Sequence, residues 1–266
     1  MLPPIQAQDR IASFLSAYDN LLENNARRIK ILEKMAQMIY REWFVNFRFP
    51  GHEKVKMVDS EMGSIPKGWD ASCVGRLAEE LRDSTNPAEL APDTPCVGLE
   101  HIPRKSIALS DWGSAGEVQS TKLRFKRGDI LFGKIRPYFH KVVVAPIAGV
   151  CSSDAIVIAP KKAEFLPLVL CCVSSEDFVA HATHTSQGTK MPRANWDVLT
   201  RYPVPLPEAS ILTRFNDAIK PMIELIVNLI FRNRNLRQTR DLLLPKLVSG
   251  EINVEHFERE AVAQGV

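Results

Sequence analysis

The sequence lacks the motifs of the common enzyme classes. It has no GxxxxGK[ST] phosphate loop, no GxGxxG after a strand, no GxSxG elbow and no HExxH pair. Its acidic residues form no obvious metal-nuclease cluster. Asp129 and Lys134 are the nearest pair, and an Asp in a Gly-Asp turn is usually structural. We therefore expect a non-catalytic protein that uses no cofactor.

Cysteine is scarce, and long apolar runs are absent. The five cysteines are odd in number and lack CxxC spacing, which favours reduced, mostly buried thiols over disulfides. They are Cys73, Cys96, Cys151, Cys171 and Cys172. His181 and His184 have no matching Cys or His pair nearby, so zinc is not expected. No run approaches the ~20 apolar residues of a membrane span, and no signal peptide precedes the first helix. We expect a cytoplasmic protein without metal or membrane.

A large net charge is also absent, since the formal charge is +3 for 266 residues. Its distribution is uneven: residues 51–100 hold 5 Lys/Arg against 10 Asp/Glu. Residues 122–141 contain seven basic residues and a single acidic one, Asp129. The basic residues are Lys122, Arg124, Lys126, Arg127, Lys134, Arg136 and Lys141. One cationic patch on a near-neutral body is typical of a phosphate-binding surface, although a solvated strand-and-turn surface fits it equally well.

What the sequence does contain is a repeat that relates its two ends. Leu2-Pro3 reappears without a gap as Leu206-Pro207, and Arg10 as Arg214. Seam residues in both copies alternate steps of four and three, which is the pattern of a coiled coil. The first seam includes Ile11, Leu15, Leu22, Asn25, Ile29 and Leu32, and the second Phe215, Ile219, Leu229, Asn233 and Leu236. We expect Asn25 to fix the register at a cost in stability.

The sequence predicts three segments: a long helical arm at 1–48, a globular domain at 49–205, and a second long helix with a tail at 206–266. The fold class is α+β, with a β-rich domain between two helices that form an antiparallel coiled coil. Turn-rich residues 45–70 are predicted to be a linker. Strands are expected over residues 96–99, 122–125, 130–134, 141–145 and 155–159, and helices over 6–44, 165–173 and 176–183.

The second long helix carries two prolines inside its pattern. Proline removes a backbone hydrogen bond and crowds the preceding turn, so Pro221 predicts a kink or break near Lys220. Pro245 is expected to end the regular seam. The tail at 251–266 is expected to fray.

Two runs in the globular domain suit contacts with nucleic acid. Residues 134–141 (KIRPYFHK) interleave basic and aromatic groups, and Arg can reach guanine while Lys can reach phosphate. In residues 187–193 (QGTKMPR), Gln187 can pair with adenine and Thr189 can bind phosphate, although this run alone favours a polar surface loop. The predicted DNA-binding residues are Lys122, Arg124, Lys134, Arg136, Tyr138, His140, Lys141, Gln187, Thr189, Lys190 and Arg193.

The chain resembles the specificity subunits of type I restriction–modification systems. Residues 2–11 (LPPIQAQDRI) are similar to the family's helix start LPPLxEQxxI, and residues 63–69 (GSIPKGW) to the GxIPxGW opening of a target recognition domain. Residues 128–138, 188–193 and 246–252 complete the set. The second helix start, LPEAS at 206–210, departs from the pattern.

The resemblance implies a non-catalytic subunit whose full form has two recognition domains, each reading half of a split site in double-stranded DNA. Two conserved helices pair as an antiparallel coiled coil and dock the methyltransferase (modification) subunits, while a separate restriction motor-nuclease subunit cuts DNA. This chain has both helices but one recognition domain. The resemblance therefore implies a half-length form that reads one half-site, and it leaves a homodimer open.

Two other functions stay open. The chain could be a coiled-coil assembly adaptor whose central module binds protein, or a standalone nuclease. Salt-dependent binding of the purified chain to duplex DNA would argue against the adaptor, and metal-dependent cleavage by the pure chain would indicate the nuclease.

Overall fold

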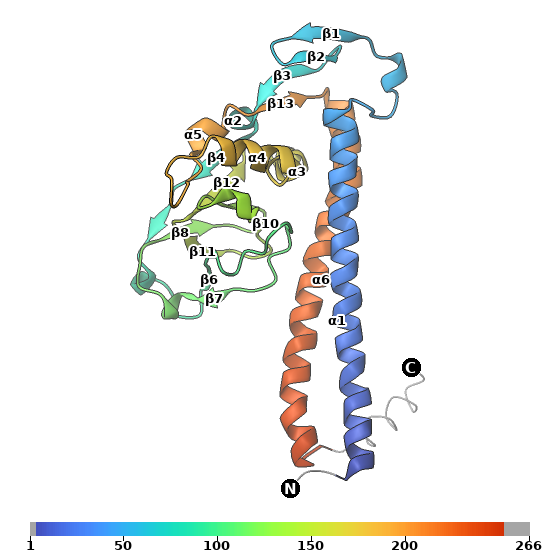
Figure 1. The fold of residues 1–266 in the computed structure, drawn as a ribbon, viewed down its shortest axis with the longest axis vertical. Coiled ribbons are helices and arrows are strands. Elements are labelled where there is room, and N and C mark those ends of the chain that lie inside the picture. Colours follow the sequence, from blue (N-terminus) through green and yellow to red (C-terminus); the bar gives the residue numbers. More distant parts are fainter. Residues whose placement is uncertain (1–3, 253–266) are drawn as a thin grey trace. The chain divides into compact units, whose positions relative to one another are not determined.

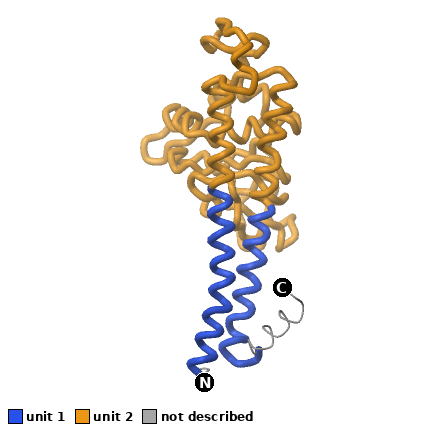
Figure 2. The backbone as a smooth tube through the Cα atoms, turned by 90° about the vertical axis from the view of Figure 1, so that its right-hand side faces the viewer, with its two compact units in different colours: residues 1–30, 228–266 blue, residues 31–227 orange. Residues whose placement is uncertain are grey.

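The computed structural model describes residues 4–252. They divide into two compact units, one of residues 4–30 with 228–252 and one of residues 31–227 (Figure 2). Two long helices, α1 (Ile5–Tyr40) and α6 (Ala209–Ser249), contribute to both units (Figure 1). The predicted mixture of helix and sheet, with a long helix towards each end of the chain, is confirmed. The predicted segment boundaries stay predictions.

In the smaller unit, α1 and α6 touch through polar and apolar contacts. The Asn25 Nδ2 donates to Asn233 Oδ1 at 2.9 Å, and both side chains are buried. Ile11 packs with Leu247, and the Arg240 guanidinium lies 2.7 Å from the Asp19 carboxylate. As the position advances along α1 from Ile11 to Asn25, the partner on α6 moves back from Leu247 to Asn233.

The larger unit contains two main sheets and two smaller sheets of two strands each. The four-stranded sheet has the order β10-β9-β12-β4, and the five-stranded sheet the order β5-β8-β11-β6-β7. Their strands are β4 (Ala78–Leu81), β5 (Ser84–Thr85), β6 (Pro95–Val97), β7 (Gly113–Ser114), β8 (Lys122–Phe125), β9 (Ile130–Gly133), β10 (Val142–Val144), β11 (Gly149–Ser152) and β12 (Ala155–Pro160). All pairings are antiparallel except β11 with β6.

The five predicted strands are all present, because β-branched residues bounded by turn residues mark them. Their side chains form a core that includes Val97, Phe125, Leu131, Val143 and Val157. The two predicted helices are also confirmed as α3 (Leu166–Val173) and α4 (Glu176–His184). The Ser175 Oγ caps α4 by accepting from the Phe178 N–H, and Phe178 packs edge-on against Phe132 of β9.

The segment predicted as a linker is structured. A π-helical turn (Arg41–Val45) and a 3-10 turn (His52–Lys54) lead into a hairpin of β1 (Met57–Ser60) and β2 (Gly63–Pro66). β3 (Asp70–Cys73) then pairs with β13 (Pro203–Leu206). An aromatic cluster joins these elements: Phe44 lies 4.8 Å from Phe215 and 5.5 Å from Trp69, and Phe49 lies 5.0 Å from Trp69, measured between ring centroids.

The prolines of α6 do not interrupt it. The helix runs continuously through Pro221, so the predicted break is absent, while the predicted kink stays a prediction. Buried Ile219 and Ile223 flank Pro221, and we attribute the continuity to their packing, which offsets the lost hydrogen bond. The helix also continues past Pro245 to Ser249, and Leu247 still packs with Ile11, so the expected end of the seam at Pro245 is wrong. Most of the tail predicted to fray lies outside the described residues.

All five cysteines are free thiols, and all except Cys73 are buried. Between residues 4 and 252, no single helix is long and apolar enough to cross a membrane. The bent pair of segments 163–173 and 176–184 passes that test only jointly, by length and composition. No group of three or more His, Cys, Asp or Glu suited to a metal ion occurs in the same part of the chain.

Candidate nucleic-acid interface

The fold brings the two predicted DNA-binding runs side by side. The Arg136 N–H donates to the Pro192 carbonyl at 2.7 Å, and the Ala194 N–H donates to the Lys134 carbonyl at 2.9 Å. Ile135 and Arg193 face each other in an isolated antiparallel bridge. Residues 134–141, which follow β9, and residues 187–193, which follow α4, therefore form one continuous edge, here called the basic edge.

The first run is shaped by a turn with unusual backbone angles. The recognition turn, Arg136–His140, contains a 3-10 helix over Pro137–Phe139 between Arg136 at φ 49° and His140 at φ 52°. Left-handed angles at residues other than glycine cost about 1–3 kcal/mol and persist where the surrounding structure enforces them. Tyr138 at the tip of the turn is 50% exposed.

Five of the predicted contact residues present their side chains to solvent on the basic edge: Tyr138, Gln187, Thr189, Lys190 and Arg193. Lys134 and Arg136 are half-buried. An Arg136 terminal nitrogen lies 3.5 Å from the Lys190 carbonyl, while the buried Arg136 Nε has no hydrogen-bond partner among the described residues. The Arg193 guanidinium lies 3.8 Å from Asp154. The edge thus combines cations, an amide, a hydroxyl and an aromatic ring.

Two other predicted residues of the first run, His140 and Lys141, form hydrogen bonds within the domain. His140 is buried, and its Nε2 lies 2.9 Å from the Ser174 carbonyl. The Lys141 Nζ donates to the Leu99 carbonyl. Burial lowers the pKa of Lys141, and the neighbouring charge of Arg104 lowers it further. Contact of either residue with DNA stays a prediction.

The remaining two predicted residues, Lys122 and Arg124, lie on β8 in the other sheet. Lys122 is buried, and its Nζ donates to the hydroxyl of Ser120 at 2.5 Å and to its carbonyl at 2.8 Å. Arg124 is exposed and donates to the Thr85 hydroxyl at 2.8 Å. Asp154 connects this sheet to the basic edge, because it follows β11 and its carbonyl accepts from the Lys134 N–H at 3.0 Å.

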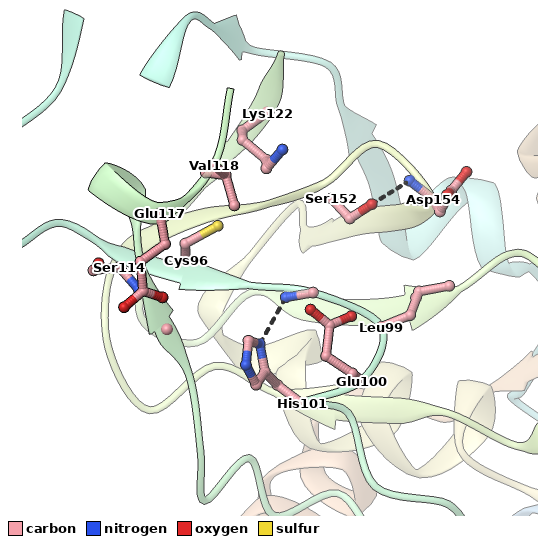
Figure 3. Close-up of a pocket in the computed structure, with 12 residues that line it drawn as sticks. Cys96, Leu99, Glu100, His101, Ser114, Glu117, Val118, Lys122, Ser152 and Asp154 are labelled. Atoms are coloured by element: carbon pink, nitrogen blue, oxygen red, sulfur yellow. Dashed lines mark hydrogen bonds between the residues drawn. The ribbon is translucent and has the colours of Figure 1, made fainter. Parts of the chain in front are cut away.

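A cavity of about 400 Å³ opens beside β6, β7 and β11. Figure 3 shows the carboxylates of Glu100, Glu117 and Asp154, the Lys122 ammonium and the His101 ring around it. The His101 Nδ1 accepts from the Gly98 N–H at 2.9 Å, so its other nitrogen carries the proton. Because carboxylates and cations both line the cavity, it can bind either a cationic or an anionic group.

The sequence analysis missed several residues that shape this region. Arg104 lies 4.0 Å over the Phe139 ring, and Lys105 pairs with Glu176 at 2.9 Å. The consecutive basic pair after Pro103 was a signal that could have been read. Glu100 and Asp154 carry no comparable local pattern, because strands distant in sequence bring them to the cavity.

A second exposed surface lies on α1. Ile31, Met35 and Met38 are 50%, 43% and 67% exposed, and their spacing of four and three places them on one helical face. Glu33 and Gln37, which also lie on α1, instead form hydrogen bonds with Ser106 and Ser174 of the globular domain. This helix therefore has one polar, bonded face and one apolar, uncovered face within the larger unit.

Comparison with known proteins identifies relatives over nearly the whole chain, although no family model matches it. The chain is 26% identical over 263 residues to the type I restriction enzyme MjaIX specificity subunit of Methanocaldococcus jannaschii. It is 28% identical over 210 residues to the EcoDI specificity subunit of Escherichia coli. The alignments cover 96% and 74% of this chain, respectively. The chain is a homologue of type I restriction enzyme specificity subunits. This confirms the resemblance inferred from the motifs.

The chain spans only part of the length of these relatives. The alignments span 61% of the MjaIX subunit and 45% of the EcoDI subunit. The fold is also similar to the crystal structure of a type I S subunit from M. genitalium, with a TM-score of 0.59 at 16% identity. That similarity covers 92% of this chain and 61% of the other.

Proposed function

We propose that this protein is a sequence-specific DNA-binding subunit that directs a type I restriction–modification complex to one half of its site. The observation that carries the proposal is the joining of residues 134–141 and 187–193 into one exposed basic edge. The two runs are separated by some 50 positions in the sequence, yet backbone hydrogen bonds of 2.7–2.9 Å hold them together. Homology to specificity subunits makes duplex DNA the ligand that fits this edge best.

On the basic edge, the side chains can divide the work of recognition. Arg136 and Arg193 can reach guanine bidentately, and Gln187 can pair with adenine. Lys134, Lys190 and Thr189 suit phosphate oxygens. Lys122, Arg124, His140 and Lys141 remain predicted contacts, although the internal hydrogen bonds of Lys122, His140 and Lys141 would have to open first.

We further propose that α1 and α6 form an antiparallel coiled coil. Every predicted seam residue among Ile11, Leu15, Leu22, Asn25, Ile29, Leu32, Phe215, Ile219, Leu229, Asn233 and Leu236 is buried or half-buried. In the smaller unit, the buried amide pair Asn25–Asn233 supports a fixed register. In the larger unit, Trp43 lies 5.7 Å from Phe215 between ring centroids, as expected for helices running in opposite directions.

The helices are also the proposed docking site for methyltransferase subunits. Exposed Ile31, Met35 and Met38 form an apolar face, and such faces usually mark contacts with partner proteins. A restriction motor-nuclease would join through that assembly. The subunit itself would contribute no catalysis and no cofactor, and the complex would act on DNA in the cytoplasm.

One copy of the domain would read one half of a split site. Two copies related by a two-fold axis would read a split palindrome. The homodimer is therefore part of the proposal. Analytical ultracentrifugation of the chain with its methyltransferase subunit should show two copies of this chain per complex.

Methylation-site mapping in cells that carry this chain with its methyltransferase subunit tests the function. We expect methylation at one split palindromic sequence, with none in cells that lack this chain. Methylation that ignores this chain, or a single-copy complex that modifies a non-palindromic site, would refute the proposal.

A further inference from the structure

Two polar residues on α1 bond to the domain that carries the basic edge. The Gln37 Nε2 donates to the Ser174 Oγ at 2.9 Å and to the Cys171 carbonyl at 3.1 Å. One helical turn earlier, a Glu33 oxygen accepts from the Ser106 hydroxyl at 2.6 Å and from the Ile107 N–H at 2.8 Å. These contacts attach α1 to two separate segments, the α3–α4 junction and the loop at 104–107.

Both segments then meet at His140. The His140 ring places Nε2 2.9 Å from the carbonyl of Ser174, whose side chain Gln37 holds. The His140 carbonyl accepts from the Lys105 N–H at 2.8 Å, next to the serine that Glu33 holds. Because a carbonyl only accepts, the His140 Nε2 must carry the proton. His140 is thus fixed through its ring on one side and its backbone on the other.

His140 closes the recognition turn. Its N–H donates to the Pro137 carbonyl at 2.8 Å, and its left-handed backbone angle of 52° sets the end of the turn. At the other end, the Arg136 N–H bonds to Pro192 and so carries the loop at 187–193. A continuous set of contacts therefore leads from α1 through His140 to both halves of the basic edge.

We propose that Gln37, Ser174 and His140 are positioning residues that set the geometry of the recognition turn relative to α1. The inference rests on the proposed DNA-reading function and adds a means by which the helix can control base discrimination. The left-handed angle at His140 is strained, so the turn keeps its shape only while the bonds to His140 hold. A partner that shifts α1 would thereby act on the turn that carries Arg136.

The test uses the chain assembled with its methyltransferase subunit. Gln37→Met removes both donated hydrogen bonds with little change in size. His140→Met removes the ring donor, while His140→Gln keeps an N–H at similar reach. Lys34→Gln serves as a control on the same helix. Amide hydrogen exchange over residues 134–141 reports the turn, and the ratio of methylation at the mapped site to single-mismatch sites reports discrimination.

Losing one net hydrogen bond corresponds to about a 2- to 10-fold change in an equilibrium. We expect Gln37→Met and His140→Met to speed exchange and lower the discrimination ratio by about that factor. His140→Gln should recover part of the loss seen in His140→Met, and Lys34→Gln should resemble the wild type. Unchanged exchange and discrimination in Gln37→Met would overturn the positioning role, as would His140→Gln behaving like His140→Met. If the wild-type complex itself shows no site preference, the proposed function fails, and the recognition role of these residues fails with it.

Discussion

The cations of the central domain fall into two groups that differ in where their charged atoms lie. The ammonium groups of Lys122 and Lys141 bond to oxygens of the protein itself. Lys190 and Arg193 lie exposed on the basic edge. A charge count along the sequence treats these groups alike. The comparison shows that a basic window contains cations that stabilise the fold and does not by itself mark the cations that can meet a phosphate.

The largest expected effect comes from the arginines of the basic edge. Arg136→Ala with Arg193→Ala should abolish site-specific methylation by the assembled complex, because each bidentate base contact contributes about 1–3 kcal/mol. Methylation-site mapping measures the result. Arg127→Ala is the matched control, since Arg127 is exposed in the same basic window. Unchanged methylation in the double variant would place the DNA surface elsewhere.

The next effect tests a half-buried cation, Lys141. Lys141→Met should lower the free energy of unfolding by about 0.5–1.5 kcal/mol, because the Leu99 carbonyl loses one of its two hydrogen bonds and keeps the one from the Ile102 N–H at 3.3 Å. Urea unfolding followed by circular dichroism gives the value. Lys126→Met, which changes an exposed lysine, should stay within about 0.5 kcal/mol of the wild type. Equal stabilities for the two variants would show that the Lys141 ammonium has no structural role.

Salt dependence compares one member of each group directly. Lys190→Ala should weaken binding to all duplexes similarly and reduce the slope of log K against log salt by about one unit, as expected for one lost phosphate contact. The sequence predicts the same change for Lys122. If Lys122→Met instead leaves the slope unaltered in a folded protein, the Lys122 ammonium makes no phosphate contact and only bonds within the protein. Fluorescence anisotropy at several salt concentrations gives both slopes.

The smallest effect at neutral pH concerns the thiol of Cys151, whose pKa is influenced by the buried Lys122. Burial raises the pKa of Cys151 to about 12, and Cys96 nearby raises it while Lys122 opposes the shift. The unfolded chain loses this proton near pH 8.5, whereas the folded chain keeps it. Stability should therefore fall as pH rises from about 9 to 12, by about 1.4 kcal/mol per pH unit for this group.

Cys151→Ala should remove that contribution from the alkaline slope, although it also lowers stability at pH 7 by leaving a small cavity. Unfolding measured at intervals between pH 7 and 11 separates the two effects. A slope equal to that of the wild type would mean that Cys151 ionises as easily in the folded chain as in the unfolded one.

Local patterns were enough to predict the elements that depend on nearby residues. The long helices follow from their repeated spacing, and β9, β10 and β12 from short apolar runs between turns. The hairpin of β1 and β2 was missed because its strands are short and mostly exposed, so no burial pattern marks them. The break at Pro221 was predicted from a local rule that packing on both sides of the proline overrides.

The sequence by itself determined the two long helices, the β-rich domain between them and the residue types available for DNA contact. Only the tertiary structure decided which of those residues meet. Residues 134–141 and 187–193 come together because β9 and α4 belong to one core, through Phe132 and Phe178. Contacts with other segments also bury His140, whereas Lys190 and Arg193 stay exposed. Burial depends on contacts between distant segments, and a sequence pattern records only near neighbours.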